Sequence, residues 1–317
     1  MNARRVRRAI VLAGFALVAG ACGGTQPSSN LTSPQPVASS PSPVASPFVV
    51  PSPSAEVVAN PAPVVQGQPY RPDLPPPEDF VAVIDNPYMP FMPGTRTVFE
   101  GVSEGQRERN VVLVTDRTKV ILGVMTTVVH DQVFSANGDL AEDTFDWYAQ
   151  DRFGNVWYFG EDTAEYANGK VSSTTGSWEA GVHGAQPGVV MLAQPTVGES
   201  YHQEFLKGEA EDVGTVVALD ESVTVPYGSL DQILVTEDTT PLEPQILEHK
   251  FYAPGIGVVM ERVLRGGQEM SRLVSYSPRR SAQKSNRPAK CSATSGRTSS
   301  YSATRWPPGV RNEQHGP

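Results

Sequence analysis

The sequence predicts an all-β domain, an antiparallel meander that forms a strongly curved sheet or partial barrel. Short runs rich in β-branched and aromatic residues recur along the middle of the chain, for example at residues 111–114 and 156–159. Hairpin-turn dipeptides such as Asn137-Gly138 and Asn168-Gly169 separate these runs. No stretch keeps the 3.6-residue apolar period of an amphipathic helix, so short antiparallel strands are expected throughout.

Alternation along residues 144–150 bears on the shape of the sheet. One side of this strand carries apolar side chains, and the other carries polar side chains with one tyrosine. The apolar set is Phe145, Trp147 and Ala149, and the polar set is Asp146, Tyr148 and Gln150. Such a pattern suits a curved sheet that covers a core with one face and leaves the other face less buried.

The first 21 residues predict a secretory signal peptide. Four arginines lie within the first eight residues, and the 13 residues from Ala9 to Ala21 carry no charge. A helix that spans a bilayer needs about 20 apolar residues, so this stretch is too short to cross one. A basic start, a short apolar stretch and small residues at its end are typical of an export signal.

The small residues end at a cysteine. Residues 18–22, Val-Ala-Gly-Ala-Cys, resemble a bacterial lipobox, in which Cys22 is acylated on its thiol and becomes the new N-terminus. The resemblance implies an exported protein whose partner is the membrane. Lipidated Cys22 would anchor it to the outer face of the cell membrane, or to the outer membrane where two exist. The alternative is a plain signal peptide with a chance cysteine.

Both ends of the mature chain are expected to be disordered. Residues 22–78 predict a tether, because they contain 15 prolines among Ser, Ala, Val and Gln. The folded domain is expected at residues 79–277. Residues 278–317 carry eight Lys or Arg against one acid, Glu313, and are rich in Ser and Pro. We expect a disordered basic tail there, with a surface-binding tail as the functional alternative.

Charge and cysteine content exclude several classes of function. The chain has a net charge of −9 although both of its ends are basic, so the predicted domain is strongly acidic. An acidic domain repels phosphate backbones, and nucleic acid is therefore not an expected partner. The two cysteines are Cys22 and Cys291, which leaves the predicted domain without a disulfide framework or a thiolate zinc site.

Several motifs between residues 80 and 277 resemble a family of secreted bacterial proteins of unassigned function. The motifs are Asp85-Asn86-Pro87-Tyr88, Pro93-Gly94-Thr95, Asp146 to Asp151, Gly154 to Glu161, Gly176 to Gly181, Val225 to Gly228 and Tyr252 to Gly257. The strand pattern is also similar to lipoprotein carriers of the LolA and LolB type. That similarity implies a curved β-sheet and does not by itself imply a function.

The chain contains no motif of a well-known catalytic or metal site. A Gly-x-Ser-x-Gly elbow, a His-Glu-x-x-His pair, a Walker loop and a dinucleotide fingerprint are all absent from the sequence. Acidic residues cluster in turns, but without the Asp-x-Asp-x-Asp-Gly spacing of a calcium loop. We therefore expect no catalytic residue, no metal site and no cofactor.

Aromatic and acidic side chains of neighbouring strands give the candidate ligand-binding residues. Most aromatic residues of this region should lie in the core. Those on the less buried face are expected to line, with the acids beside them, a groove for a lipid, a glycan or another amphipathic ligand. The candidates are Asp146, Tyr148, Tyr158, Glu161, Trp178, Glu179 and Tyr201.

Three functions remain open from the sequence. The leading hypothesis is a non-catalytic binding or carrier lipoprotein of the cell envelope, which follows from the anchor, the tether and the curved sheet. The second is a hydrolase acting on envelope or extracellular polymers, which requires two facing carboxylates among Asp146, Glu161, Glu179 and Glu211. The third is a scaffold subunit of an envelope assembly.

Overall fold

The computed structural model describes residue 61 and residues 73–279. The predicted signal peptide, Cys22, most of the predicted tether and the predicted basic tail lie outside the described residues. The end of the predicted tether is described, and it contains a turn of 3-10 helix, η1 (Pro77–Asp79). Among the described residues there is no helix with the length and apolar character that a bilayer crossing requires.

Antiparallel strands make up most of the rest of the described chain. They are β1 (Phe80–Val81), β2 (Arg96–Ser103), β3 (Gln106–Ile121), β4 (Val124–Ser135), β5 (Leu140–Asp151), β6 (Val156–Ala167), β7 (Lys170–Ser173), β8 (Trp178–Glu179), β9 (Gln186–Met191), β10 (Ser200–His202), β11 (Glu204–Phe205), β12 (Val213–Val225), β13 (Gly228–Thr239), β14 (Leu247–Ala253), β15 (Gly257–Arg265) and β16 (Met270–Ser277). The predicted turn at Asn168-Gly169 joins β6 to β7, with φ angles of 54° and 72° that a type I′ hairpin turn requires. The all-β prediction is confirmed.

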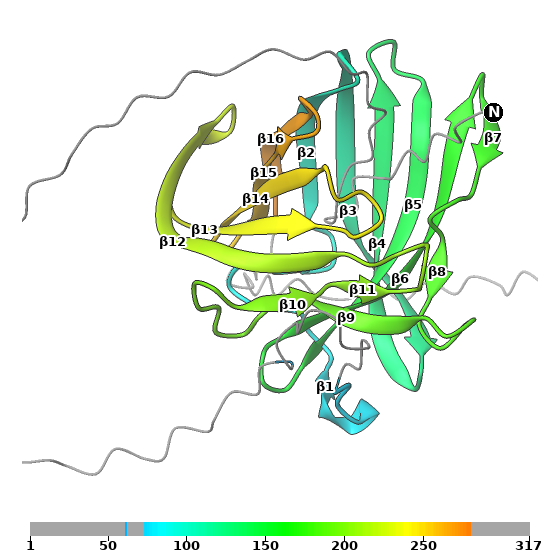
Figure 1. Cartoon of the computed structure of the whole chain (residues 1–317), viewed down its shortest axis with the longest axis vertical. Helices are drawn as coiled ribbons and strands as arrows, with labels where there is room; N and C mark the ends of the chain where they lie inside the picture. Colours follow the sequence, from blue (N-terminus) through cyan, green and yellow to red (C-terminus); the bar gives the residue numbers. More distant parts are fainter. Residues whose placement is uncertain (1–60, 62–72, 280–317) are drawn as a thin grey trace, which may run out of the picture. The chain divides into compact units, whose positions relative to one another are not determined.

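The strands form one sheet in which most neighbours are consecutive in sequence. The order is β10-β12-β13-β14-β15-β16-β2-β3-β4-β5-β6-β9-β11, and the pairings along it are antiparallel. β10 and β11 are successive pieces of one segment, so continuous chain joins the two ends of the sheet. The sheet is therefore nearly closed into a barrel, as its curvature in Figure 1 shows, and the predicted curved sheet or partial barrel is confirmed.

Two glycines let the closing segment approach its neighbours. β10 pairs with β12, and β11 pairs with β9. A Cβ atom on Gly188 of β9 would overlap the backbone of Gln203, and a Cβ atom on Gly214 of β12 would lie 3.1 Å from the ring of Tyr201. The seam of the barrel therefore depends on the absence of side chains at these two positions.

We expect Gly188→Ala to destabilise the protein by about 1–3 kcal/mol, because the new methyl group meets backbone rather than a flexible side chain. Urea unfolding measures the loss, and amide hydrogen exchange locates it. Exchange should accelerate at β10 and β11. The control is Gly138→Ala, where an added methyl group meets no atom within 4 Å but the φ angle of 86° strains an alanine, so stability should fall while exchange at β10 and β11 stays unchanged. Unchanged exchange at the seam of Gly188→Ala would contradict the close approach.

The polar side of β5 faces the interior, which is the opposite of the prediction for residues 144–150. Asp146 and Tyr148 are 2% and 0% exposed. On the outer side, Phe145 stacks on His130 at 4.3 Å, and the Nζ atom of Lys119 lies 3.3 Å from the centre of the Trp147 ring. The alternation was predicted correctly, but the less buried face was assigned wrongly because long basic side chains cover the apolar outer face.

The segment from Ile84 to Phe91, which contains the Asp85-Asn86-Pro87-Tyr88 motif, holds one end of the sheet together. The side-chain amide of Asn86 donates to the carbonyl oxygens of Gly154 and Leu192, at 2.9 and 3.1 Å. These oxygens belong to the β5–β6 turn and to the chain just after β9. The backbone amide of Gly255, in the β14–β15 turn, donates to the Pro87 carbonyl at 2.7 Å. The motif is therefore structural at this position.

Candidate binding site

The interior of the barrel changes from apolar to acidic along the strands. On β3, the inward side chains run from Val114 and Val112 to Asn110, and on β15 from Val258 to Glu261. We use the name acidic layer for the buried charged residues of the second region. The acidic layer consists of Asp131, Glu142, Asp146, Glu161, Asp238, Glu248, Lys250 and Glu261. Strand pairing places Asp146 opposite Glu161, and Lys250 opposite Glu261.

Five of the predicted ligand-binding residues lie together at the boundary between the two regions. The rings of Tyr148 and Tyr158 stack at 4.8 Å, and Trp178 meets Tyr158 edge-on at 5.3 Å. The hydroxyl of Tyr158 donates to Asp146 at 2.9 Å, and Asp146 pairs across the strands with Glu161. The structure therefore brings Asp146, Tyr148, Tyr158, Glu161 and Trp178 into one aromatic and acidic cluster.

The other two predicted residues lie elsewhere. Tyr201 on β10 is 1% exposed, and its hydroxyl has no hydrogen-bond partner in the described structure. Burial raises the pKa of Tyr201; the nearby Tyr252 and Asp238 raise it further, and Lys250 lowers it. Glu179 points to the outer side, where its carboxylate contacts Lys119 at 2.8 Å. Glu179 does not lie with the interior residues, since it follows Trp178 in the same strand and so faces the other way.

Burial raises the pKa of the carboxyl groups on β4 and β5. The pKa of Glu142 is raised to about 8, against the lowering effect of hydrogen bonds from Thr144 and Thr163. The pKa of Asp146 is raised to about 7, although the Tyr158 hydroxyl lowers it. Burial also raises the pKa of Asp131, and the neighbouring charges of Asp146 and Glu142 add to the shift. At neutral pH these carboxyl groups are therefore partly protonated and partly ionised.

Lys250 is the only buried Lys or Arg among the described residues. Its Nζ atom lies 2.8 Å from Asp238 Oδ2, and Gln203 Nε2 donates to the same oxygen at 3.1 Å. Burial lowers the pKa of Lys250, but the surrounding carboxylates outweigh burial and raise it above its usual value. The same burial raises the pKa of Glu261 to about 7, against the lowering effect of Lys250.

Two side chains of this region carry acceptor oxygens, three in all, that have no hydrogen-bond partner in the described structure. Both carboxylate oxygens of Glu261 are in this position, and Glu261 is 2% exposed. The Oε1 atom of Gln203 is the other, on a side chain that is fully buried and whose amide nitrogen already binds Asp238. Buried polar atoms usually have partners, so these oxygens mark a place where donors are missing.

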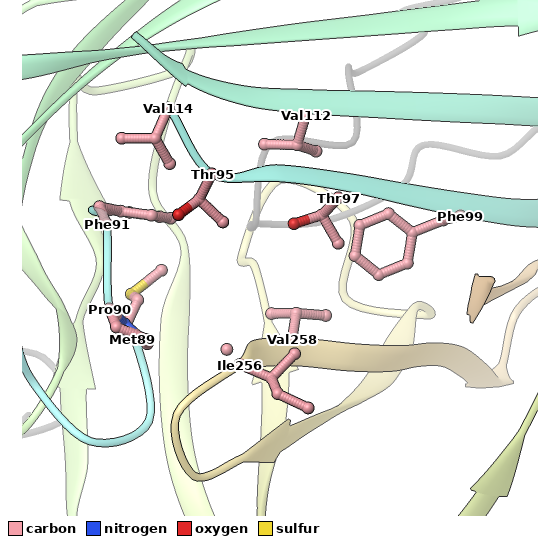
Figure 2. Close-up of a pocket in the computed structure, with 11 residues that line it drawn as sticks. Met89, Pro90, Phe91, Thr95, Thr97, Phe99, Val112, Val114, Ile256 and Val258 are labelled. Atoms are coloured by element: carbon pink, nitrogen blue, oxygen red, sulfur yellow. The ribbon is translucent and has the colours of Figure 1, made fainter. Parts of the chain in front are cut away.

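An apolar pocket opens at the other end of the same inner faces (Figure 2). It is a half-open hollow, and the roughly 400 Å³ within its rim that no protein atom fills includes open solvent. The lining residues come from the segment before β2, from β2, β3 and the start of β15, and they are Met89, Pro90, Phe91, Thr95, Thr97, Phe99, Val112, Val114, Ile256, Gly257 and Val258. The hydroxyl of Thr95 is buried there and has no hydrogen-bond partner in the described structure.

The carboxylates named for the hydrolase alternative are only partly brought together. Asp146 and Glu161 are cross-strand neighbours inside the barrel, whereas Glu179 lies outside and Glu211 accepts a hydrogen bond from Gly208 in an exposed turn. Within residues 73–279, no group of three or more His, Cys, Asp or Glu is arranged to hold a metal ion. The structure therefore leaves one carboxylate pair for that alternative.

Sequence reasoning missed the buried charged residues on β14 and β15 and the apolar pocket. Glu248, Lys250 and Tyr252 alternate along β14 and share a face, which the spacing alone shows. Neither the spacing nor the composition shows that this face is the inner one. Thr95 was noticed as part of a motif, but its role in a pocket depends on residues of β15 that lie far away in sequence.

Comparisons with other proteins add little to this geometry. No protein-family model matches the chain, and none of the curated proteins matches it either. Among solved structures, the chain is similar to a crystal structure described as a "putative lipoprotein" from Parabacteroides distasonis. The two share 11% sequence identity with a TM-score of 0.34, over 60% of this chain and 98% of that chain. The motif-based family resemblance stays a prediction, and the functional argument depends on the site itself.

Proposed function

We propose that the protein is a non-catalytic binding or carrier lipoprotein of the cell envelope, and that it holds the apolar part of an amphipathic ligand in the pocket of Figure 2. The single observation that carries this proposal is the composition of the pocket. Its wall is apolar apart from two threonine hydroxyls, and one of them, on Thr95, is buried without a partner in the described structure. The envelope location follows from the predicted signal peptide and from Cys22.

The unpartnered hydroxyl supports a ligand rather than a purely structural role. A buried polar group that lacks a hydrogen bond costs about 1–3 kcal/mol, and valine would fill the same volume without that cost. Ligand sites are mostly apolar and contain a few polar groups that fix the orientation of the ligand. Thr95 supplies one such group beside the side chains of Phe91, Val112 and Val114. This wall favours a lipid or another amphipathic molecule over a glycan.

We expect Thr95→Val to make the free protein more stable and to weaken ligand binding. Removing the unpartnered hydroxyl should raise the free energy of unfolding by about 1 kcal/mol. The affinity for an uncharged dansyl-labelled lipid that carries an acceptor near its tail should fall about fivefold, which corresponds to one lost hydrogen bond. Urea unfolding and fluorescence titration of the full chain measure the two effects.

The matched control is Thr118→Val, at an exposed position near the end of β3. It should change neither quantity. The proposal fails if no fluorescent or natural lipid probe binds the unmodified chain, or if Thr95→Val binds as tightly as the unmodified chain does.

A further inference from the structure

We propose that the acidic layer binds the head group of this ligand and that the head group is a positively charged amine. The ligand is then a cationic amphiphile, whose tail occupies the apolar pocket and whose ammonium group lies beside Glu261. The inference rests on the proposed function, because the pocket fixes where the tail lies. It adds the charge and the hydrogen-bonding character of the head group.

The pocket and the acidic layer lie on the same inner surface. Val258 lines the pocket and Glu261 follows it by three residues on β15, about 10 Å along a strand; the register shift between Val258 and Met260 adds one residue and so keeps both on the inner face. β3 shows the same change, from Val112 in the pocket to Asn110 further along. A linear ligand with its alkyl tail in the pocket would have to extend its polar end about 10 Å along β15 to reach Glu261.

The hydrogen-bonding inventory near Glu261 calls for donors. The two carboxylate oxygens of Glu261 and the Oε1 atom of Gln203 are acceptors without partners in the described structure, and all three are buried. Lys250, which contacts Asp238 at 2.8 Å, donates no hydrogen bond to these three oxygens. A primary ammonium group carries three donors and no acceptor, so it matches these groups in number and kind.

The charge balance points the same way. The acidic layer contains seven carboxylic acids and a single cation, Lys250, which pairs with Asp238 at 2.8 Å. Bringing an anionic head group into this surrounding would add a like charge in a poorly solvated place, which is costly. A cationic head group instead offsets the excess of acid. The same reasoning disfavours an ordinary fatty acid as the natural ligand.

The test compares two ligands that share one tail. Decylammonium and decanoate are titrated into the full chain at neutral pH, below the concentrations at which they form micelles, and binding is followed by calorimetry. We expect decylammonium to bind at least tenfold tighter than decanoate. Glu261→Gln should remove most of that preference, and Glu221→Gln, an exposed acid on β12, should leave it unchanged. Binding of the amine should also release protons to the buffer, because it favours the ionised form of Glu261.

Each result separates the two proposals. Equal binding of decylammonium and decanoate overturns the amine assignment and leaves the apolar pocket as a lipid site. A preference for the amine that survives in Glu261→Gln also overturns it, because the attraction then comes from the net charge of −9 and not from this site. Failure of both ligands to bind overturns the proposed function as well.

Discussion

Lys250→Met should destabilise the protein by about 3–5 kcal/mol, which is the range expected when one partner of a buried ion pair is removed. Methionine fills a similar volume, so the loss comes from the carboxylates that remain. Asp238 loses the ammonium group 2.8 Å away, and Glu248 and Glu261 lose the cation that lowers their pKa. Urea unfolding at neutral pH measures this loss.

Two further variants make the Lys250 result specific. Lys170→Met, at an exposed position on β7, removes the same charge from the surface and should change the unfolding free energy by less than about 0.5 kcal/mol. Combining Lys250→Met with Asp238→Asn removes both partners of the pair and should recover part of the loss. A Lys250→Met protein that is as stable as the Lys170→Met protein would show that the acidic layer does not depend on this cation.

The stability of the protein should fall as the pH rises from about 5 to 8, by about 3 kcal/mol or more in total. The pKa values of Glu142, Asp146 and Glu261 are raised in the folded protein to about 8, 7 and 7, from ordinary values of 4.5, 3.8 and 4.5. Because the folded protein holds these protons more tightly than the unfolded chain does, stability is greatest below the unfolded pKa values. It is lost as the pH rises through the folded ones. Each unit of pKa difference corresponds to about 1.4 kcal/mol.

Urea unfolding at a series of pH values measures this trend, and Glu142→Gln tests its origin. Glutamine keeps an acceptor for the hydroxyls of Thr144 and Thr163 but cannot ionise, so the fall between pH 6 and 8 should become shallower. Glu221→Gln removes an exposed acid and should leave the slope as it is. A protein whose stability rises over this interval would rule out buried, protonated carboxyls in the acidic layer.

The fold was largely predictable because its signals are local. Turn dipeptides such as Asn168-Gly169 and the two-residue alternation of the strands depend only on neighbouring residues, and both appear in the structure as expected. The direction of each face was not predictable in the same way. Asp146 and Tyr148 lie inside because strands from the whole domain surround them, and Phe145 and Trp147 are covered from outside by side chains of β3 and β4.

Of the candidate site, only the residues on β5 and β6 could be predicted from the sequence. Tyr148, Tyr158 and Asp146 come from adjacent strands of one hairpin, so the sequence brought them together. Lys250 and Glu261 come from a different hairpin, and their relation to Asp131 depends on how far the sheet curves. The separation of Glu179 from Trp178 follows from the strand itself, since two successive residues of a strand face opposite sides.

The pairing of β2 with β16 has a consequence for how the domain folds. These strands lie at opposite ends of the described sequence, yet they are neighbours in the sheet and pair from Arg96–Ser277 to Val102–Met270. The other pairings along the sheet join segments much closer in the chain, so they can form as successive hairpins. Closure at β2 and β16 carries the largest loop entropy. A chain that emerges from its N-terminus first therefore presents an unpaired edge at β2 until its last strand arrives, and that interval is when it is most exposed to wrong pairing.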